Sequence, residues 1–276
     1  MHPDWLIPDW PAPKSVRAVF TTRAGGVSDL PYDSMNLGDH VGDLSGHIAE
    51  NRALLQRATG ARAVFLKQVH GSDVLAFGTD TPDGRPADAC VTIQRRTACT
   101  IMVADCLPVL LTTERGNVVA AAHAGWRGLA GVGGENRVTA KGGKGILASF
   151  YESFSALAQA GQSQVAIKTI AWLGPCIGPS AFEVGPEVKA AFEATQPEAS
   201  RFFVEIGAGK YLADLPGLAR LRLQALGISR IYGNDGSAPW CTVSNPSRFF
   251  SHRRDAGVNG NGFGTTGRMA ACIWLD

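Results

Sequence analysis

The chain has 276 residues, of which 45% are hydrophobic and 18% charged, with a net charge of +2. This is the composition of an ordinary globular protein with a sizeable core. The charge is too small to indicate a nucleic-acid or membrane surface, and no apolar segment is long enough to span a bilayer. The N-terminus lacks the pattern of a signal peptide. We therefore expect a cytoplasmic protein without a nucleic-acid or membrane partner. Separately, we expect a small-molecule substrate and a monomer or weak homodimer.

A strand and a helix are predicted in the first sixty residues. Residues 16–22 have strand composition and lead into a glycine turn at 23–28. Apolar residues recur at helical spacing over 45–59. Ser45 is in position to cap this helix, and Gly60 to end it.

The rest of the chain mixes short strands and helices without strict βαβ alternation. Strands are predicted near 63–69, 73–77, 99–104, 107–112, 117–122, 165–173, 228–232 and 270–275. Helices are predicted over 146–160, 186–194 and 215–226. This mixture favours an α+β fold with mixed sheets.

A glycine-rich stretch interrupts this pattern at 131–145. It contains six glycines and little apolar content. No G-x-x-x-x-G-K-[ST] pattern is present, so a phosphate-binding loop is disfavoured. We predict a peripheral, mobile loop, because its glycines raise the entropy cost of ordering.

Three apolar runs of strand type end in a potential metal ligand, namely His70, Cys106 and His123. Zinc and copper accept imidazole and thiolate ligands. Catalytic zinc has three protein ligands and keeps one position for water or substrate. However, a histidine at a strand end is more often a hydrogen-bonded core residue, and a buried cysteine is more often inert. The spacing matches no zinc finger, so the residues alone leave both interpretations open.

Other polar residues surround these three. Asp105 precedes Cys106 and is expected to turn into the cavity, where it supports the ligands or handles a proton. Arg127 follows His123 by four positions, and arginine binds phosphate in bidentate fashion. Further candidates are Arg23, Asn36, His40, His252, Arg253 and Arg254. For Arg253 and Arg254 taken singly, surface ion pairing is the simpler interpretation.

Eight motifs together resemble a known family. They are TTRAGGVS at 21–28, PYDSMNLG at 31–38, NR at 51–52, KQVHG at 67–71, ADCLP at 104–108, HAGWRG at 123–128, LGPCIG at 173–178 and FFSHRRD at 249–255. The family is the YfiH family, also called the multicopper polyphenol oxidase or laccase-domain family. The resemblance covers about residues 19–274.

The resemblance implies one domain over 1–276, with four layers in the order α/β/β/α, similar to the catalytic domain of cytotoxic necrotizing factor toxins. It also implies a Zn²⁺ or Cu²⁺ ion held by His70, Cys106 and His123. We assign catalytic roles to Cys106, His123, Asp105 and Arg127. We assign substrate-binding roles to Arg23, Asn36, His252 and Arg254. Two stretches depart from the family pattern, because 131–145 is long and 257–264 resembles an insertion.

The resemblance implies a metal-dependent purine nucleoside phosphorylase. Family members phosphorolyse adenosine, inosine, guanosine and methylthioadenosine, and they deaminate adenosine. Others are described as laccases or as peptidoglycan editing factors. A full laccase needs a separate copper cluster with many more histidines, whereas this chain has six in total. The alternatives are a copper-dependent polyphenol oxidase, a precursor hydrolase with Cys106 as nucleophile and His123 as base, and a non-enzymatic zinc protein.

Overall fold

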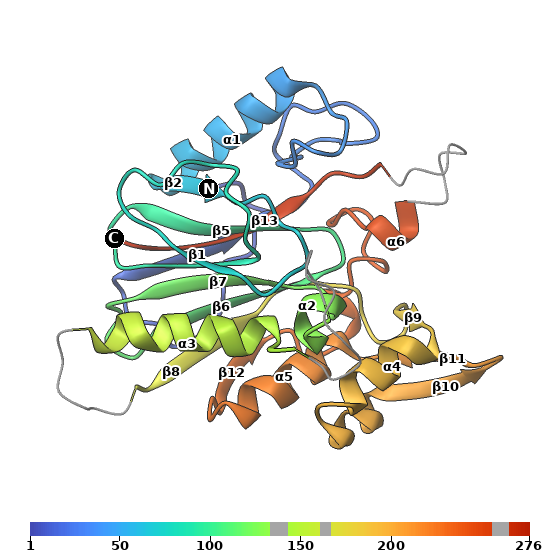
Figure 1. Ribbon diagram of the computed structural model, residues 1–276. Coiled ribbons are helices and arrows are strands. Elements are labelled where there is room, and N and C mark those ends of the chain that lie inside the picture. Colours follow the sequence, from blue (N-terminus) through green and yellow to red (C-terminus); the bar gives the residue numbers. More distant parts are fainter. Residues whose placement is uncertain (133–142, 161–166, 256–264) are drawn as a thin grey trace.

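Two β-sheets lie face to face at the centre of the fold, with helices on both outer sides (Figure 1). The computed structural model describes residues 1–132, 143–160, 167–255 and 265–276. Most of the predicted glycine-rich loop at 131–145 and all of the predicted insertion at 257–264 therefore lie outside the described residues.

The first sheet contains the first and the last strand of the chain, which pair with each other. Its strand order is β1 (Val16–Phe20), β13 (Met269–Leu275), β5 (Thr97–Val103) and β2 (Arg62–Phe65). β13 runs antiparallel to β1 and β5, whereas β2 runs parallel to β5. The last strand is thus central, and the segment that precedes it lies close to the end of β5.

The second sheet has six strands and is also mixed. Their order is β12 (Arg230–Gly233), β8 (Thr169–Leu173), β6 (Leu107–Thr113), β7 (Val119–Ala124), β4 (Ala89–Thr92) and β3 (Val74–Ala76). The two outer pairs, β12–β8 and β3–β4, are parallel, and the inner pairs are antiparallel.

Both faces of each central strand are buried. In β5, Cys99, Ile101 and Val103 pack between the two sheets, while Ala98 and Met102 pack on the opposite side. This separation follows from the alternation of side chains along a strand. The same alternation explains why the strand reads as a continuous apolar run rather than an amphipathic one.

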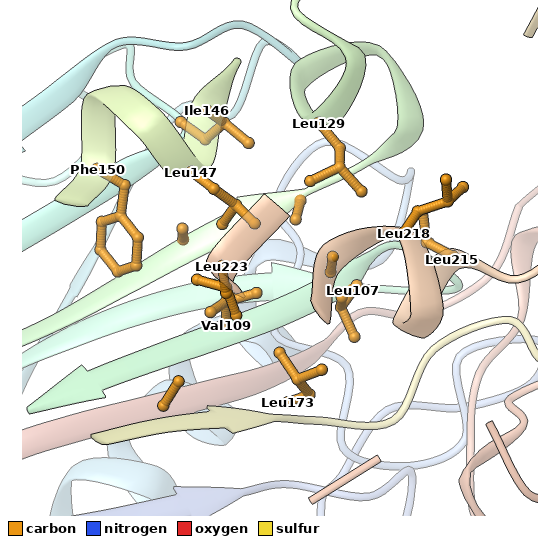
Figure 2. Packing of buried hydrophobic residues seen from close by; sticks show 14 of the residues in the cluster. Leu107, Val109, Leu129, Ile146, Leu147, Phe150, Leu173, Leu215, Leu218 and Leu223 are labelled. Atoms are coloured by element: carbon orange, nitrogen blue, oxygen red, sulfur yellow. The ribbon is translucent and has the colours of Figure 1, made fainter. Parts of the chain in front are cut away.

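Helices cover the outer face of the second sheet. α3 (Ile146–Gln159) and α5 (Leu215–Ala225) lie across it. Figure 2 shows Phe150 of α3 and Leu223 of α5 pointing toward Val109 of β6. Burial of such side chains contributes roughly 1.5–3 kcal/mol each.

The helix α1 (Ser45–Thr59) covers the outer face of the first sheet and has the predicted bounds. It ends at Gly60, whose φ of 67° is the left-handed conformation that favours glycine. The predicted cap at Ser45 is wrong. The N-cap residue is Leu44, and Ser45 is already helical, so no side chain caps the first turn.

The remaining elements lie at one end of the second sheet. They are the helices α2 (Trp126–Ala130), α4 (Pro186–Glu193) and α6 (His252–Asp255), the 3₁₀ turns Pro197–Phe202 and Ala238–Trp240, and a sheet of β10 (Phe203–Gly207), β11 (Lys210–Ala213) and β9 (Glu183–Val184). The predicted four-layer α+β fold with mixed sheets is confirmed, and its likeness to the toxin domain stays a prediction. No helix within the described residues has the length and apolar character to cross a membrane.

Candidate metal centre

Cys106 and His123 meet because of the register between two neighbouring strands. β6 begins at Leu107, directly after Cys106, and β7 ends at Ala124, directly after His123. The strands are antiparallel, with Leu107 opposite Ala124 and Pro108 opposite His123. The start of one strand therefore lies beside the end of the other, at one edge of the second sheet.

His70 reaches the same place from the first sheet. β2 runs parallel to β5, so the chain beyond β2 continues alongside the end of β5. Gln68 extends this pairing, because its amide donates to the carbonyl of Met102 and accepts from its N–H, both at 2.8 Å. His70 then turns with a φ of 59°. Non-glycine residues adopt this conformation at a cost, which the surrounding contacts offset.

The three side chains form one cluster. One ligand atom from each of His70, Cys106 and His123 lies within 4.8 Å of the other two. The two imidazole centroids are 4.8 Å apart, with 78° between the ring planes. His123 is buried, Cys106 is half-buried and His70 is exposed. The cluster is therefore accessible from the side of His70.

Gly125 lets the chain pass close to this cluster. A Cβ atom at this position would lie 3.1 Å from Sγ of Cys106 and 3.2 Å from Cδ2 of His70. The φ of Gly125 is −66°, which any residue adopts. A side chain at this position of the HAGWRG motif is therefore disfavoured by the space beside Cys106 and His70 and not by backbone conformation.

Asp88 supports two of the three ligand candidates. Its Oδ1 lies 2.9 Å from Nδ1 of His123. The same carboxylate accepts backbone hydrogen bonds from Val69, His70 and Gly71 at 3.1, 2.9 and 2.7 Å. Asp88 is fully buried. It fixes the ring of His123, leaving Nε2 for a ligand, and it holds the turn that carries His70.

The charges of this cluster depend on one another. Burial opposes ionisation of Cys106, but the charge of His123 and hydrogen bonds from both imidazoles lower the pKa of the thiol to about 6. Burial likewise opposes protonation of His123, but the charge of Cys106 and the contact with Asp88 raise its pKa to about 9. At neutral pH the metal-free cluster therefore holds a thiolate beside an imidazolium.

A cavity of about 220 Å³ opens from this cluster. Besides the three ligand candidates, its polar wall consists of Gln68, His40, His252 and Arg268. His40 and His252 come from segments far apart in the sequence, and both are exposed. The cavity thus combines the ligand cluster with two further imidazoles and a guanidinium group.

Asp105, which we expected to support the ligands or handle a proton, anchors the C-terminal segments. Its carboxylate accepts hydrogen bonds from Oγ1 of Thr242 at 2.5 Å, Oγ of Ser251 at 3.0 Å and the N–H of Arg253 at 2.6 Å. Its φ is 85°. These contacts fix the segment that carries His252 next to Cys106.

Two predicted substrate-binding residues hold the loops of the N-terminal part. Arg23 pairs with Asp33 at 2.8 Å and donates to the carbonyl of Pro246 at 2.8 Å. Asn36 is fully buried, and its Oδ1 accepts from the N–H groups of Gly38 and Arg268, both at 2.9 Å. Neither Arg23 nor Asn36 belongs to the described lining of the cavity.

The predicted residues near α2 and α6 differ in their surroundings. His252 lines the cavity. Arg254 pairs with Asp255 at 2.8 Å and donates to backbone carbonyls. Arg127 is exposed, and its guanidinium stacks 4.4 Å from the ring centre of Trp126. The phosphate role of Arg127 stays a prediction.

Sequence reasoning missed Asp88 and Arg268. Each is a charged residue that directly precedes an apolar strand, Asp88 before β4 and Arg268 before β13. Cys106 was identified by a different signal, because it follows the apolar run at 99–104. The position of Arg268 just before the predicted strand at 270–275 is a signal that could have identified it, whereas Asp88 precedes β4, a strand that the sequence did not predict.

The donor set fits a metal ion of borderline softness. A thiolate with a low pKa and two imidazoles match the preferences of zinc and copper, and the carboxylate behind His123 is typical of metal-ligating histidines. Among the described residues this is the one group of three or more such ligands. The fold and the site together define a mixed α/β protein in which three candidate metal ligands face a cavity.

The sequence matches a family over nearly its whole length. Residues 17–276 match the family described as multi-copper polyphenol oxidoreductase laccase. An Escherichia coli protein named purine nucleoside phosphorylase YfiH is 44% identical over 98% of both chains. A Pseudomonas aeruginosa protein named as a purine nucleoside phosphorylase is 42% identical, over 99% of this chain and 98% of its own. The chain therefore belongs to the multi-copper polyphenol oxidoreductase laccase family.

Solved structures share the fold. A Neisseria meningitidis protein is 42% identical, covers 99% of each chain and has a TM-score of 0.83. YlmD from Geobacillus stearothermophilus is 31% identical over 95% of this chain and 92% of its own, with a TM-score of 0.77.

Proposed function

We propose that this protein is a metal-dependent purine nucleoside enzyme. It phosphorolyses adenosine, inosine, guanosine and methylthioadenosine, and it deaminates adenosine. The names of the bacterial relatives support the phosphorolysis. The observation that carries the proposal is the convergence of His70, Cys106 and His123 at the wall of a cavity that also contains Arg268 and His252. Such a cavity offers a metal centre together with donors for an anion.

His70, Cys106 and His123 would hold the ion, which we propose to be Zn²⁺. Cu²⁺ competes for the same ligands, because it binds most nitrogen and sulfur sites more tightly. When bound, the ion supplies a Lewis acid that polarises an oxygen and makes water a nucleophile near neutral pH. Asp88 keeps His123 in the tautomer that a metal requires.

The remaining residues bind and orient the substrates. His252 offers an N–H to substrate oxygens at the cavity wall. Asp105 and Arg254 hold the segment that carries it, and Arg23 and Asn36 hold the facing loops. Placing the reacting groups together in this way lowers the entropy cost of a reaction between two substrates.

Two alternatives use the same residues. A copper-dependent polyphenol oxidase is favoured by the family description, but a laccase needs a further copper cluster. A hydrolase that edits peptidoglycan precursors is favoured by the low pKa of Cys106, since a thiolate beside a histidine is a nucleophile. Alkylation would abolish this activity, whereas chelation would not.

A substrate panel separates these functions. The zinc-loaded and copper-loaded proteins are each incubated with the four nucleosides, with and without phosphate, with a phenol, and with a muropeptide precursor. We expect free purine bases only when phosphate is present, and inosine from adenosine without it. The Cys106→Ser variant should lose both reactions, whereas Cys272→Ala, outside the cavity, should keep them. Phenol oxidation or precursor hydrolysis without nucleoside turnover would contradict the proposal.

A further inference from the structure

Arg268 lines the same cavity as the ligand cluster. It directly precedes β13, the central strand of the first sheet, and is half-buried. The arginines predicted from the sequence to bind an anion come from other loops, whereas Arg268 is the arginine within the described lining. Its surroundings indicate what it binds.

The position of Arg268 is fixed from several sides. Its backbone N–H donates to Oδ1 of Asn36 at 2.9 Å. Its Nη1 donates to the carbonyls of Thr266 and Gly267 at 2.8 and 3.2 Å. Its stem lies against Gly38, where an added Cβ would be 2.7 Å from Cγ of the arginine. The guanidinium is therefore held in place before any ligand binds.

The charge of Arg268 has no carboxylate partner among the described residues, whereas Arg23 and Arg254 each have one. Arg23 pairs with Asp33 and Arg254 with Asp255, both at 2.8 Å. Within the same described residues, the side-chain hydrogen bonds of Arg268 all use Nη1, so Nε and Nη2 donate to no protein atom. Two donors of a planar fork thus remain for a ligand.

Partial burial makes this unpaired charge costly. Burial lowers the pKa of Arg268, while the charges of Cys106 and Asp105 act in the opposite direction. Neither group is available as a partner. The carboxylate of Asp105 already accepts three hydrogen bonds, and Cys106 faces the two imidazoles. A bound anion would offset the cost of keeping the guanidinium there.

Two imidazoles complete the surroundings. His40 and His252 line the cavity with Arg268 and are both exposed. An imidazole carries at least one N–H donor in either charge state. The carboxylate of Asp39 lies 3.5 Å from Nδ1 of His40 and 3.2 Å from Nη2 of Arg52, which leaves Nε2 of His40 for a ligand. Three cationic or neutral donors therefore surround this part of the wall, an arrangement that suits a tetrahedral oxyanion.

We propose that Arg268, with His40 and His252, forms the subsite for inorganic phosphate as the co-substrate of phosphorolysis. The assignment rests on the proposed function. A phosphate oxygen forms a bond to C1′ of the nucleoside, and the bond from C1′ to the purine nitrogen breaks with its electron pair on the purine. The proton of hydrogen phosphate ends on the purine, so the products are a purine base and a pentose 1-phosphate. Bidentate contact from Arg268 orients the attacking anion.

The first test separates the two substrates kinetically. In zinc-loaded Arg268→Gln, we expect the KM for phosphate to rise about tenfold to a hundredfold, as for loss of a charge-assisted pair. The KM for inosine and the zinc content should change little. Arg268→Lys keeps the positive charge but not the planar guanidinium. Its KM for phosphate should lie between those of the wild type and Arg268→Gln. The control Arg57→Gln removes an exposed arginine of α1 that pairs with Glu50. An unchanged KM for phosphate in both Arg268 variants, or equal rises for both substrates, would overturn the assignment.

The second test does not depend on turnover. Inorganic phosphate should raise the melting temperature of the zinc-loaded wild type and of Arg57→Gln saturably, compared with chloride at equal ionic strength. The rise should be lost in Arg268→Gln. If no nucleoside is cleaved but this loss is seen, the proposed function fails and the anion subsite stands. If phosphorolysis occurs and the shift persists in Arg268→Gln, the subsite fails and the function stands.

Discussion

The Nδ1 atom of His123 lies 2.9 Å from Oδ1 of Asp88, and the same carboxylate accepts the backbone N–H of His70 at 2.9 Å. One buried carboxylate thus orients one ligand candidate by its side chain and another by its backbone. Burial opposes ionisation of Asp88, but the hydrogen bond and charge of His123 lower its pKa below the ordinary value. The candidate metal centre therefore depends on a residue that is not one of the three ligand candidates.

Replacing Asp88 should weaken the metal site more than the fold around it. Asp88→Asn keeps the shape and some backbone contacts but removes the charge that favours the correct tautomer of His123. We expect zinc affinity to fall by roughly ten- to a hundredfold, measured by competition with a chelating dye. Asp73→Asn, an exposed neighbour, is the control. Unchanged zinc affinity in Asp88→Asn would show that Asp88 only holds the turn at 69–71 and does not control the ring of His123.

The thiol of Cys106 should react at unusually low pH. Its pKa is lowered to about 6, so the thiolate persists down to that pH and is lost as the pH falls through it. The pKa of His123 is raised to about 9, so the imidazolium is lost as the pH rises through that value. Alkylation of the metal-free protein by iodoacetamide should therefore rise with a midpoint near pH 6. A midpoint near the ordinary cysteine value would contradict this charge arrangement.

A single methyl group at Gly125 should disturb the site without unfolding the protein. The added Cβ would press on Cys106 and His70 at 3.1 and 3.2 Å, while the backbone conformation suits alanine. We expect weaker zinc binding and a nearly unchanged melting temperature. Gly46→Ala is the matched control, because nothing lies within 4 Å of its added Cβ. Equal zinc affinity in both variants would mean that the ligands move aside at little cost.

Asp105 should matter for stability more than for metal binding. Asp105→Asn weakens hydrogen bonds to Thr242, Ser251 and the backbone of Arg253. Bonds of this charged kind contribute about 1.5–3 kcal/mol, so urea unfolding should show a loss of that order. Zinc content should be retained. If the variant keeps wild-type stability but loses activity, Asp105 handles a proton and our structural assignment is incorrect.

The apolar runs identified His70, Cys106 and His123 as candidates but left open whether they bind a metal, and the family resemblance supplied the ligand set. Such runs are recognisable without tertiary information, and the motifs around His70, Cys106 and His123 are specific. The bounds of α1 followed from its periodicity and from Gly60. The four layers followed from the family resemblance.

Asp88 and Arg268 could not be predicted in the same way. Asp88 directly precedes β4, a strand of four residues that offers too few positions to show alternation in the sequence. Arg268 enters the cavity because β13 pairs with β5, at a separation of more than 150 positions along the chain. Contacts of that kind depend on the order of strands in a sheet. Local patterns do not determine that order.

The most direct test of the account is the release of hypoxanthine from inosine by the zinc-loaded protein, measured with and without phosphate and again after chelation. We predict that hypoxanthine and ribose 1-phosphate form in equal amounts, that both require phosphate, and that both disappear on chelation and return with zinc. The Cys106→Ser variant should show neither product. Hypoxanthine release that is independent of phosphate, or that persists in the fully chelated protein, would contradict a metal-dependent phosphorolytic site formed by His70, Cys106 and His123.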